Sequence, residues 1–173
     1  MTIRNLEAML APKSIALIGA TPRIGSVGGT IARTLAAAGF AGPIHLVNPH
    51  HHEIDGRPCY PGIDALPAVP DLAVVATPPA TIPALIAQLS ARGCRAVLVI
   101  TAGLDAELKQ RALAAGRDNV VRILGPNSLG LMLPPIGLDA TFAHRAALPG
   151  DLAFLSQSGA LVTAVVDWAS ERP

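Results

Sequence analysis

The chain has 173 residues and a net charge of +1 at pH 7, and 51% of its residues are hydrophobic, 14% charged and 3% aromatic. This length suits one domain with a sizeable core, together with a short appendage. The weak charge and the few aromatic residues exclude a nucleic-acid-binding surface, and the hydrophobic fraction excludes a disordered chain. No apolar run is long enough to span a membrane and no signal peptide is visible, so we expect a cytoplasmic protein without a membrane partner.

The cysteines and histidines do not indicate a disulfide framework or a metal site. Cys59 and Cys94 are too few for such a framework, so we expect two buried thiols in a reducing compartment. Three consecutive histidines, His50–His52, lie on a polar stretch. Consecutive residues on a loop do not converge easily on one metal ion, so we expect solvated histidines.

A strand, a glycine loop and a helix are predicted between residues 14 and 39, after a short amphipathic helix that ends before Pro12. The apolar run 15–18 is followed by a loop with Gly19, Gly25, Gly28 and Gly29. The next apolar residues, Val27, Ile31 and Leu35, share one helix face, and Gly39 ends the helix. Such a loop brings backbone N–H groups to the positive end of a helix, where a phosphate binds well. The alternative is a tight turn that only packs the helix on the strand.

Strands and helices alternate through the following residues. We predict strands at 44–47, 71–76, 97–100 and 121–124. We also predict a helix with the apolar stripe Ile82, Leu85, Ile86 and Leu89, ended by Gly93, and a second helix at 105–115. This alternation predicts an α/β fold, a Rossmann-like parallel sheet with helices on both faces. Counting the strand at 71–76 as the third of five, we expect the order 3-2-1-4-5. The segment 50–62 is predicted to be a polar loop.

Unusual residues follow each predicted strand, at the edge where ligands of such folds bind. They are the loop after Gly19, Asn48-Pro49, Thr77-Pro78-Pro79, Thr101-Ala102-Gly103 and Gly125-Pro126-Asn127. NAD is the usual ligand of this fold, but it requires an acidic residue after the second strand, where Asn48 stands here. The loop also lacks the lysine of a Walker sequence. A phosphorylated ligand other than a dinucleotide or a nucleoside triphosphate therefore fits better.

Taken together, these segments resemble the CoA-binding domain of the NDP-forming acyl-CoA synthetases, the family that includes the succinyl-CoA synthetase α subunit. The matching stretches, in chain order, are GATPRIGSVG, GPIHLVNP, ITAGL, LGPNSLGL, GLDATF and LAFLSQSGAL. The resemblance implies coenzyme A or an acyl-CoA as the ligand. It also implies, as partners, further domains or a β-type ATP-grasp subunit, which would supply the catalytic residues that this chain lacks.

The resemblance also implies which residues bind CoA. Around the phosphates it places Gly19, Ala20, Thr21, Arg23, Gly25, Ser26, Val27 and Gly28. Beside the adenosine half it places Asn48, Pro49, His50, Thr77, Pro78 and Pro79. Toward the pantetheine and thiol it places Thr101, Ala102 and Gly103, and Asn127 completes the set. Replacing Gly28 by valine is expected to weaken CoA binding and to leave the fold largely intact; the alternative is that Gly28 only permits close packing.

The resemblance divides the chain into a CoA-binding domain, 1–150, and the start of a second, truncated domain, 151–173, with a strand at 152–155 and a helix after it. It implies an ADP-forming acyl-CoA ligase, such as acetate-CoA ligase, that interconverts acyl-CoA, ADP and phosphate with acid, CoA and ATP. Ser128 replaces the cysteine of many synthetases and is similar to the branch fused to an acetyltransferase, so an acyl-CoA-sensing domain of a protein lysine acetyltransferase is the alternative. An NAD-binding dehydrogenase domain is the third hypothesis.

Overall fold

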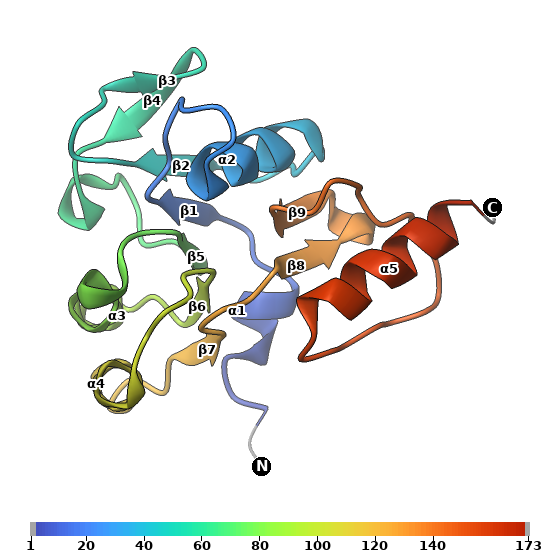
Figure 1. Cartoon of the computed structure of the whole chain (residues 1–173). Helices are drawn as coiled ribbons and strands as arrows, with labels where there is room; N and C mark the ends of the chain where they lie inside the picture. Colours follow the sequence, from blue (N-terminus) through green and yellow to red (C-terminus); the bar gives the residue numbers. More distant parts are fainter. Residues whose placement is uncertain (1–2, 172–173) are drawn as a thin grey trace.

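A computed structural model describes residues 3–171 and contains one seven-stranded sheet and a separate two-stranded hairpin (Figure 1). The sheet strands are β1 (Ile15–Ile18), β2 (Ile44–Val47), β3 (Glu53–Ile54), β4 (Arg57–Tyr60), β5 (Leu72–Val75), β6 (Ala96–Val99) and β7 (Arg122–Leu124). All neighbouring strands of this sheet are parallel except β3 and β4. The predicted fold class, a Rossmann-like parallel sheet, is therefore confirmed.

The strand order is β3-β4-β2-β1-β5-β6-β7. The six parallel strands, numbered in chain order, have the arrangement 3-2-1-4-5-6. This arrangement contains the expected 3-2-1-4-5 order, but the third place belongs to β4 and not to the strand predicted at 71–76. That strand, β5, pairs with β1 in the register Ile15 to Leu72. The segment predicted as a polar loop instead supplies β3 and β4, which pair through an Asp55-Gly56 turn. Both turn residues have positive φ, 50° and 74°, as a two-residue hairpin turn requires.

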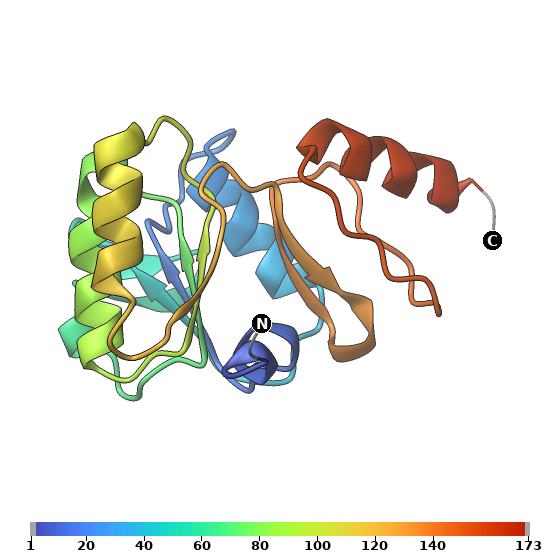
Figure 2. The ribbon, with the colours of Figure 1, turned by 90° about the horizontal axis from the view of Figure 1, so that it is seen from below.

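Helices cover both faces of the sheet, as predicted (Figure 2). The helices are α1 (Leu6–Leu10), α2 (Val27–Ala37), α3 (Ile82–Ala91), α4 (Ala106–Ala115) and α5 (Gly159–Ser170). On one face, α1, α2 and the hairpin of β8 (Gly130–Leu133) and β9 (Leu138–Thr141) share a core with Ile15 and Leu17. On the other face, α3 and α4 share a core with Ala16 and Ile18. Alternate residues of one strand thus serve opposite cores, which explains the continuous apolar run.

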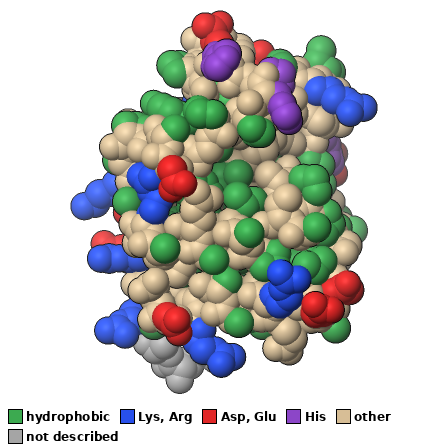
Figure 3. Space-filling view, turned by 90° about the vertical axis from the view of Figure 1, so that its left-hand side faces the viewer, with side chains coloured by type: hydrophobic (Ala, Val, Ile, Leu, Met, Phe, Trp, Pro, Cys, Tyr) green, Lys and Arg blue, Asp and Glu red, His purple; other side chains and the backbone are tan. Residues whose placement is uncertain are grey.

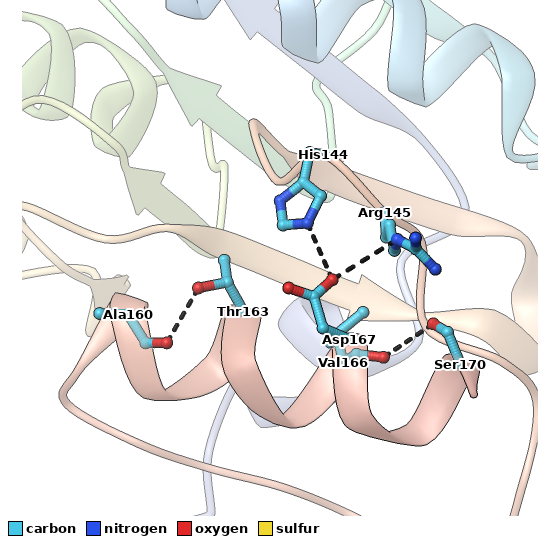
Figure 4. Close-up of polar contacts among 7 residues, drawn as sticks. All are labelled: His144, Arg145, Ala160, Thr163, Val166, Asp167 and Ser170. Atoms are coloured by element: carbon cyan, nitrogen blue, oxygen red, sulfur yellow. Dashed lines mark hydrogen bonds and ion pairs between the residues drawn. The ribbon is translucent and has the colours of Figure 1, made fainter. Parts of the chain in front are cut away.

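The C-terminal part lies beside the β8–β9 hairpin, on the side away from the sheet (Figure 2). Helix α5 is formed as predicted, but the strand expected at 152–155 is absent among the described residues, where this stretch has no regular structure. No residue of α5 is buried. His144 Nε2 lies 2.8 Å and Arg145 Nε 3.6 Å from Asp167 Oδ1, and these contacts hold α5 to the preceding loop (Figure 4).

Two predicted segments extend past the described range. The predicted N-terminal helix begins with Met1 and Thr2, which lie outside the described residues. The predicted second domain ends with residues 172–173, which also lie outside them. Within residues 3–171, no helix is both long and apolar enough to cross a membrane.

Candidate functional site

The predicted binding residues lie where the parallel strands end. The backbone N–H of Gly19 donates to Val47 O of β2 at 2.9 Å, so the glycine loop leaves β1 beside the end of β2. Helices α2 and α4 both begin at this edge, on the upper side of Figure 2. Parallel strands and the amino ends of their helices together form the usual ligand edge of such folds.

The glycine loop is built by close backbone contacts. A Cβ atom added to Gly19, whose φ is +94°, would lie 2.5 Å from Ala76 O, and one added to Gly28 would lie 2.0 Å from Gly19 O. Gly28 is buried in the first turn of α2. The expectation that Gly28→Val leaves the fold intact is therefore wrong, because any side chain at this position collides with the backbone of the preceding strand end. The structure supports the close-packing role that was the alternative.

The same turn nevertheless presents donors to a ligand. Ser26 is the N-cap of α2, and its Oγ accepts the N–H of Gly29 at 3.2 Å and donates to Arg23 O at 2.7 Å. Among residues 3–171 we find no acceptor for the N–H groups of Val27 and Gly28. They are two of the free donors that begin every helix, at its positive end.

Asn48 connects the end of β2 to the glycine loop. Its Nδ2 donates to Ala20 O at 2.7 Å, and its Oδ1 accepts the N–H of His50 at 2.8 Å. Its own N–H donates to Tyr60 O of β4 at 2.9 Å. An aspartate at this position could not donate to Ala20 O. The presence of asparagine in place of the acidic residue of an NAD site therefore has a structural reason, because the Asn48 amide holds the glycine loop.

The ends of β5, β6 and β7 are joined in the same way. Thr101 Oγ1 donates to Thr77 O at 2.7 Å, and Asn127 N donates to Thr101 O at 2.9 Å. Thr77 lies beside Gly19, and Pro79 Cγ would lie 3.7 Å from a Cβ atom at Gly103. The predicted residues from all five strand ends are thus brought together along one continuous edge; the remaining ones, such as Thr21 and Pro78, lie in the same loops.

The electrostatics of this edge are set by few groups. Arg23 is exposed in the glycine loop, and the histidines that follow β2 gather at one end of the molecule, near the β3–β4 hairpin (Figure 3). His45, within β2, packs edge-on against Tyr60 with ring centroids 5.6 Å apart, and burial lowers its pKa. His45 therefore stays neutral at pH 7 and contributes no charge to the edge.

The cysteines lie in the interior, and the Cys59 thiol donates to the carbonyl oxygen of Asn48 at 3.9 Å. Both are free and buried, as predicted, and burial raises the pKa of Cys94 to about 11 and also raises that of Cys59. A thiol with such a pKa is a poor nucleophile at pH 7. Within residues 3–171, no group of three or more His, Cys, Asp or Glu side chains is arranged to hold a metal ion.

Sequence reasoning missed one buried polar group. Asp139 of β9 is 7% exposed, and its Oδ1 accepts Thr141 Oγ1 at 2.6 Å and Thr141 N at 3.1 Å. Burial raises the pKa of this carboxyl group. The carbonyl of Thr141 in turn accepts Thr34 Oγ1 of α2 at 3.0 Å, so the hairpin is fastened to the helix whose amino end faces the site.

Two hollows lie away from the strand-end edge. One, of about 290 Å³, is lined by Ala32, Arg33, Ala36, Ala37, Leu46, Ile54, Asp55 and Arg57. The other, of about 510 Å³, is lined by Arg4, Asn5, Gly93, Cys94, Arg95, Asp118, Asn119 and Val120. Neither includes a predicted binding residue, so the candidate site is an open edge in this structure and not one of these hollows.

Comparison with known proteins identifies the class that this fold and edge define. Residues 13–134 match the CoA binding domain family, so the chain belongs to this family. It is 36% identical over 173 residues to acetate-CoA ligase [ADP-forming] I of Archaeoglobus fulgidus, covering 96% of this chain and 25% of that protein. It is 35% identical over 174 residues to the alpha subunit of acetate-CoA ligase [ADP-forming] I of Pyrococcus furiosus, covering 95% of this chain and 38% of that subunit.

A solved structure agrees with this assignment. The apo form of a dinucleotide forming acetyl-coenzyme A synthetase 1 from Ca. Korarchaeum cryptofilum superposes with a TM-score of 0.90 at 33% identity. The match covers 95% of this chain and 37% of that one. The chain therefore spans about a quarter to two fifths of the length of these relatives. The resemblance to the acyl-CoA synthetase family seen in the sequence is confirmed.

Proposed function

We propose that the chain binds coenzyme A or an acyl-CoA along the strand-end edge, with the CoA phosphates at the amino end of α2. The observation that carries this proposal is the pair of N–H groups, of Val27 and Gly28, that lack acceptors within residues 3–171. A phosphate there gains charge-assisted hydrogen bonds and the field of the helix end together. The residues of the glycine loop, Gly19 to Gly28, surround the phosphates in this proposal.

The other strand ends take the rest of the ligand. Asn48, Pro49, His50 and the Thr77-Pro78-Pro79 turn flank the adenosine half, whereas Thr101, Ala102 and Gly103 lie toward the pantetheine and thiol, with Asn127 behind them. The hydrogen bonds from Asn48 to Ala20 and from Thr101 to Thr77 support this arrangement, because they join the tips, the segments that directly follow neighbouring strands, to one another. The edge is then held in shape before the ligand arrives, which lowers the entropic penalty of binding.

We further propose that the parent protein is an ADP-forming acyl-CoA ligase, which interconverts acyl-CoA, ADP and phosphate with acid, CoA and ATP. The names of the relatives support this activity, and their greater length supports partners in the form of further domains or an ATP-grasp subunit. In this proposal residues 151–173 begin a second domain. The high exposure of Leu152 and Leu155, 83% and 91%, supports that division. A cytoplasmic location, expected from the sequence, stays a prediction.

The acetyltransferase alternative rested on Ser128. Ser128 Oγ accepts the N–H of Gly130 at 3.2 Å, so a local turn already accounts for a serine at this position. The relatives named above are ligases and a synthetase, and we therefore prefer the ligase.

Calorimetry with CoA, acetyl-CoA and NAD tests the proposal. CoA should bind the chain more tightly than NAD, because Asn48 offers no carboxylate to the ribose hydroxyls of NAD. Acetyl-CoA should behave like CoA, since the phosphates and adenosine are shared. Tighter binding of NAD than of CoA by the same folded sample would overturn the assignment.

A further inference from the structure

The connection from β2 to β4 leaves part of the sheet without a covering helix. Parallel neighbours are usually joined through an α-helix. Since β1, β2 and β4 follow one another in one direction across the sheet, a right-handed crossover from β2 to β4 would place that helix beside α2. Within residues 48–56, all of them described, the connection instead forms the short strand β3 and its turn. The space beside α2 stays open, as a hollow of about 290 Å³ between α2 and the β3–β4 hairpin.

The walls of this hollow are mostly apolar. From α2 it is lined by Ala32, Ala36 and Ala37, whose methyl groups are too short to fill it. Leu46 of β2 and Ile54 of β3 close its bottom, and each is only 1% exposed. The volume is at the lower end of the range of small-molecule sites, about 300–1,000 Å³. The hollow therefore suits a small ligand with an apolar part.

Two arginines and one aspartate complete the lining. They are Arg33 of α2, Arg57 of β4 and Asp55 of the turn between β3 and β4. Within residues 3–171, none of the three forms an ion pair. Arg57 Nη2 donates to Ile44 O at 3.3 Å, which holds the guanidinium group in place and leaves its other N–H groups for a ligand. With two positive charges against one negative charge the lining attracts an anion, and carboxylates accept strong hydrogen bonds from guanidinium groups.

We propose that this hollow binds a small carboxylate with an apolar tail, such as the anion of a short-chain fatty acid. The tail packs against the alanine methyl groups and the aliphatic stems of the arginines, and the carboxylate accepts hydrogen bonds from Arg33 and Arg57. An inorganic anion leaves the apolar walls unused, and a neutral apolar molecule leaves the guanidinium groups unused. The hollow lies along the second half of α2, apart from its amino end, so this inference goes beyond the proposed CoA site and does not depend on it.

Titration of the isotope-labelled chain with hexanoate, followed by amide chemical shifts, tests the inference. The amides of Ala36, Ala37 and Asp55 should shift along a saturating curve, whereas those of Val27 and Gly28 should not. Acetate keeps the charge and shortens the tail. Each buried CH₂ group corresponds to about a fourfold gain in affinity, so burial of half of the longer tail should make hexanoate bind about fifteenfold more tightly. Hexanamide keeps the tail without the charge and should bind about tenfold more weakly than hexanoate.

Ala36→Leu tests the hollow itself. Leucine fills the space and is nearly as good a helix former as alanine, so the variant should lose saturable binding of hexanoate without a lower melting temperature. Ala114→Leu, at an exposed position of α4, is the matched control and should bind hexanoate like the unmodified chain.

A double variant tests the two charges. Arg33→Gln combined with Arg57→Gln should weaken hexanoate binding about tenfold and change that of hexanamide less than about twofold. Arg117→Gln, which replaces an exposed arginine after α4, is the control and should leave both affinities unchanged. If the double variant does not fold, the comparison of Ala36→Leu with Ala114→Leu still decides.

Four results would overturn the inference. They are hexanoate shifts confined to Val27 and Gly28, equal affinities for hexanoate and hexanamide, undiminished binding to Ala36→Leu, and no saturable binding by the folded chain. CoA titrated into the same sample separates the two proposals. Shifts at the amino end of α2 with CoA, without any binding of hexanoate, leave the proposed function standing. Binding of hexanoate in the hollow, without any binding of CoA, leaves this inference standing and removes the proposed function.

Discussion

Val27→Pro should weaken CoA binding on the order of tenfold to a hundredfold while the chain remains folded. Proline removes the N–H of Val27, one of two donors at the amino end of α2 for which we found no acceptor within residues 3–171. A hydrogen bond to a charged group contributes about 1.5–3 kcal/mol, which corresponds to that range of affinity. The dissociation constant is measured by calorimetry.

The helix should tolerate this proline. Val27 is the first helical residue. Proline is common at this position of helices, because the N–H of the first residue has no acceptor within the helix. The preceding residue must avoid the helical region, and Ser26 is extended, with φ −85° and ψ 151°. Val27→Ala is the matched control: it removes the two γ-methyl groups, keeps the N–H and should bind CoA within about twofold of the unmodified chain. Equal affinities for the proline and alanine variants would show that this N–H does not contact the ligand.

Gly28→Val should lower the free energy of unfolding by about 3 kcal/mol, because its Cβ would lie 2.0 Å from the carbonyl oxygen of Gly19. Backbone atoms at both positions must then move apart, and the first turn of α2 can no longer pack closely against the segment that follows β1. For a chain of this size such a loss lowers the melting temperature by about 6–12 °C. The melting temperature without ligand is the measurement.

Gly25→Ala is the control for Gly28→Val, since it adds a side chain to the same loop. A Cβ atom at Gly25 meets nothing within 4 Å, although its φ of +76° disfavours a side chain. We therefore expect a smaller loss, of about 1 kcal/mol. A melting temperature for the valine variant equal to that of Gly25→Ala would contradict the close contact between α2 and β1.

Much of the sheet was predictable because its strands are apolar on both sides. The runs at 15–18 and 72–76 contribute side chains to both cores, so they are apolar throughout. This continuous apolar sequence identifies them as strands whichever strands pair with them. The sequence of a strand does not show which strands pair with it. The strand at 71–76 was therefore predicted to lie next to the second strand, whereas β5 pairs with β1 on the side away from β2. The strand that takes the third place, β4, has an alternating and partly polar sequence that was interpreted as a loop.

The two hairpins show what local patterns can and cannot indicate. The Asp55-Gly56 pair is a strong hairpin signal that could have been recognised, since both residues adopt positive φ. The β8–β9 hairpin has no such signal, because its turn is a short 3₁₀ segment with Pro134 and Pro135. Residues 152–155 are apolar enough for a strand but have no regular structure.

For the site, the sequence located the tips but not the contacts between them. Each tip follows a strand, so the parallel fold alone brings all five to one edge. The bond from Asn48 to Ala20 joins residues 28 positions apart, and a single sequence does not reveal it. The same limit applies to Gly28, whose contact with Gly19 depends on how closely α2 approaches β1.

Amide chemical-shift mapping of the isotope-labelled chain during titration with CoA tests the central claim most directly. If CoA lies along the strand-end edge, the largest changes should occur at Val27 and Gly28 and in the tips 48–50, 77–79 and 101–103. Amides at the opposite end of the sheet, such as Arg95 and Asn119, should stay unchanged. Changes confined to that opposite end, or none at saturating CoA, would contradict the proposed site.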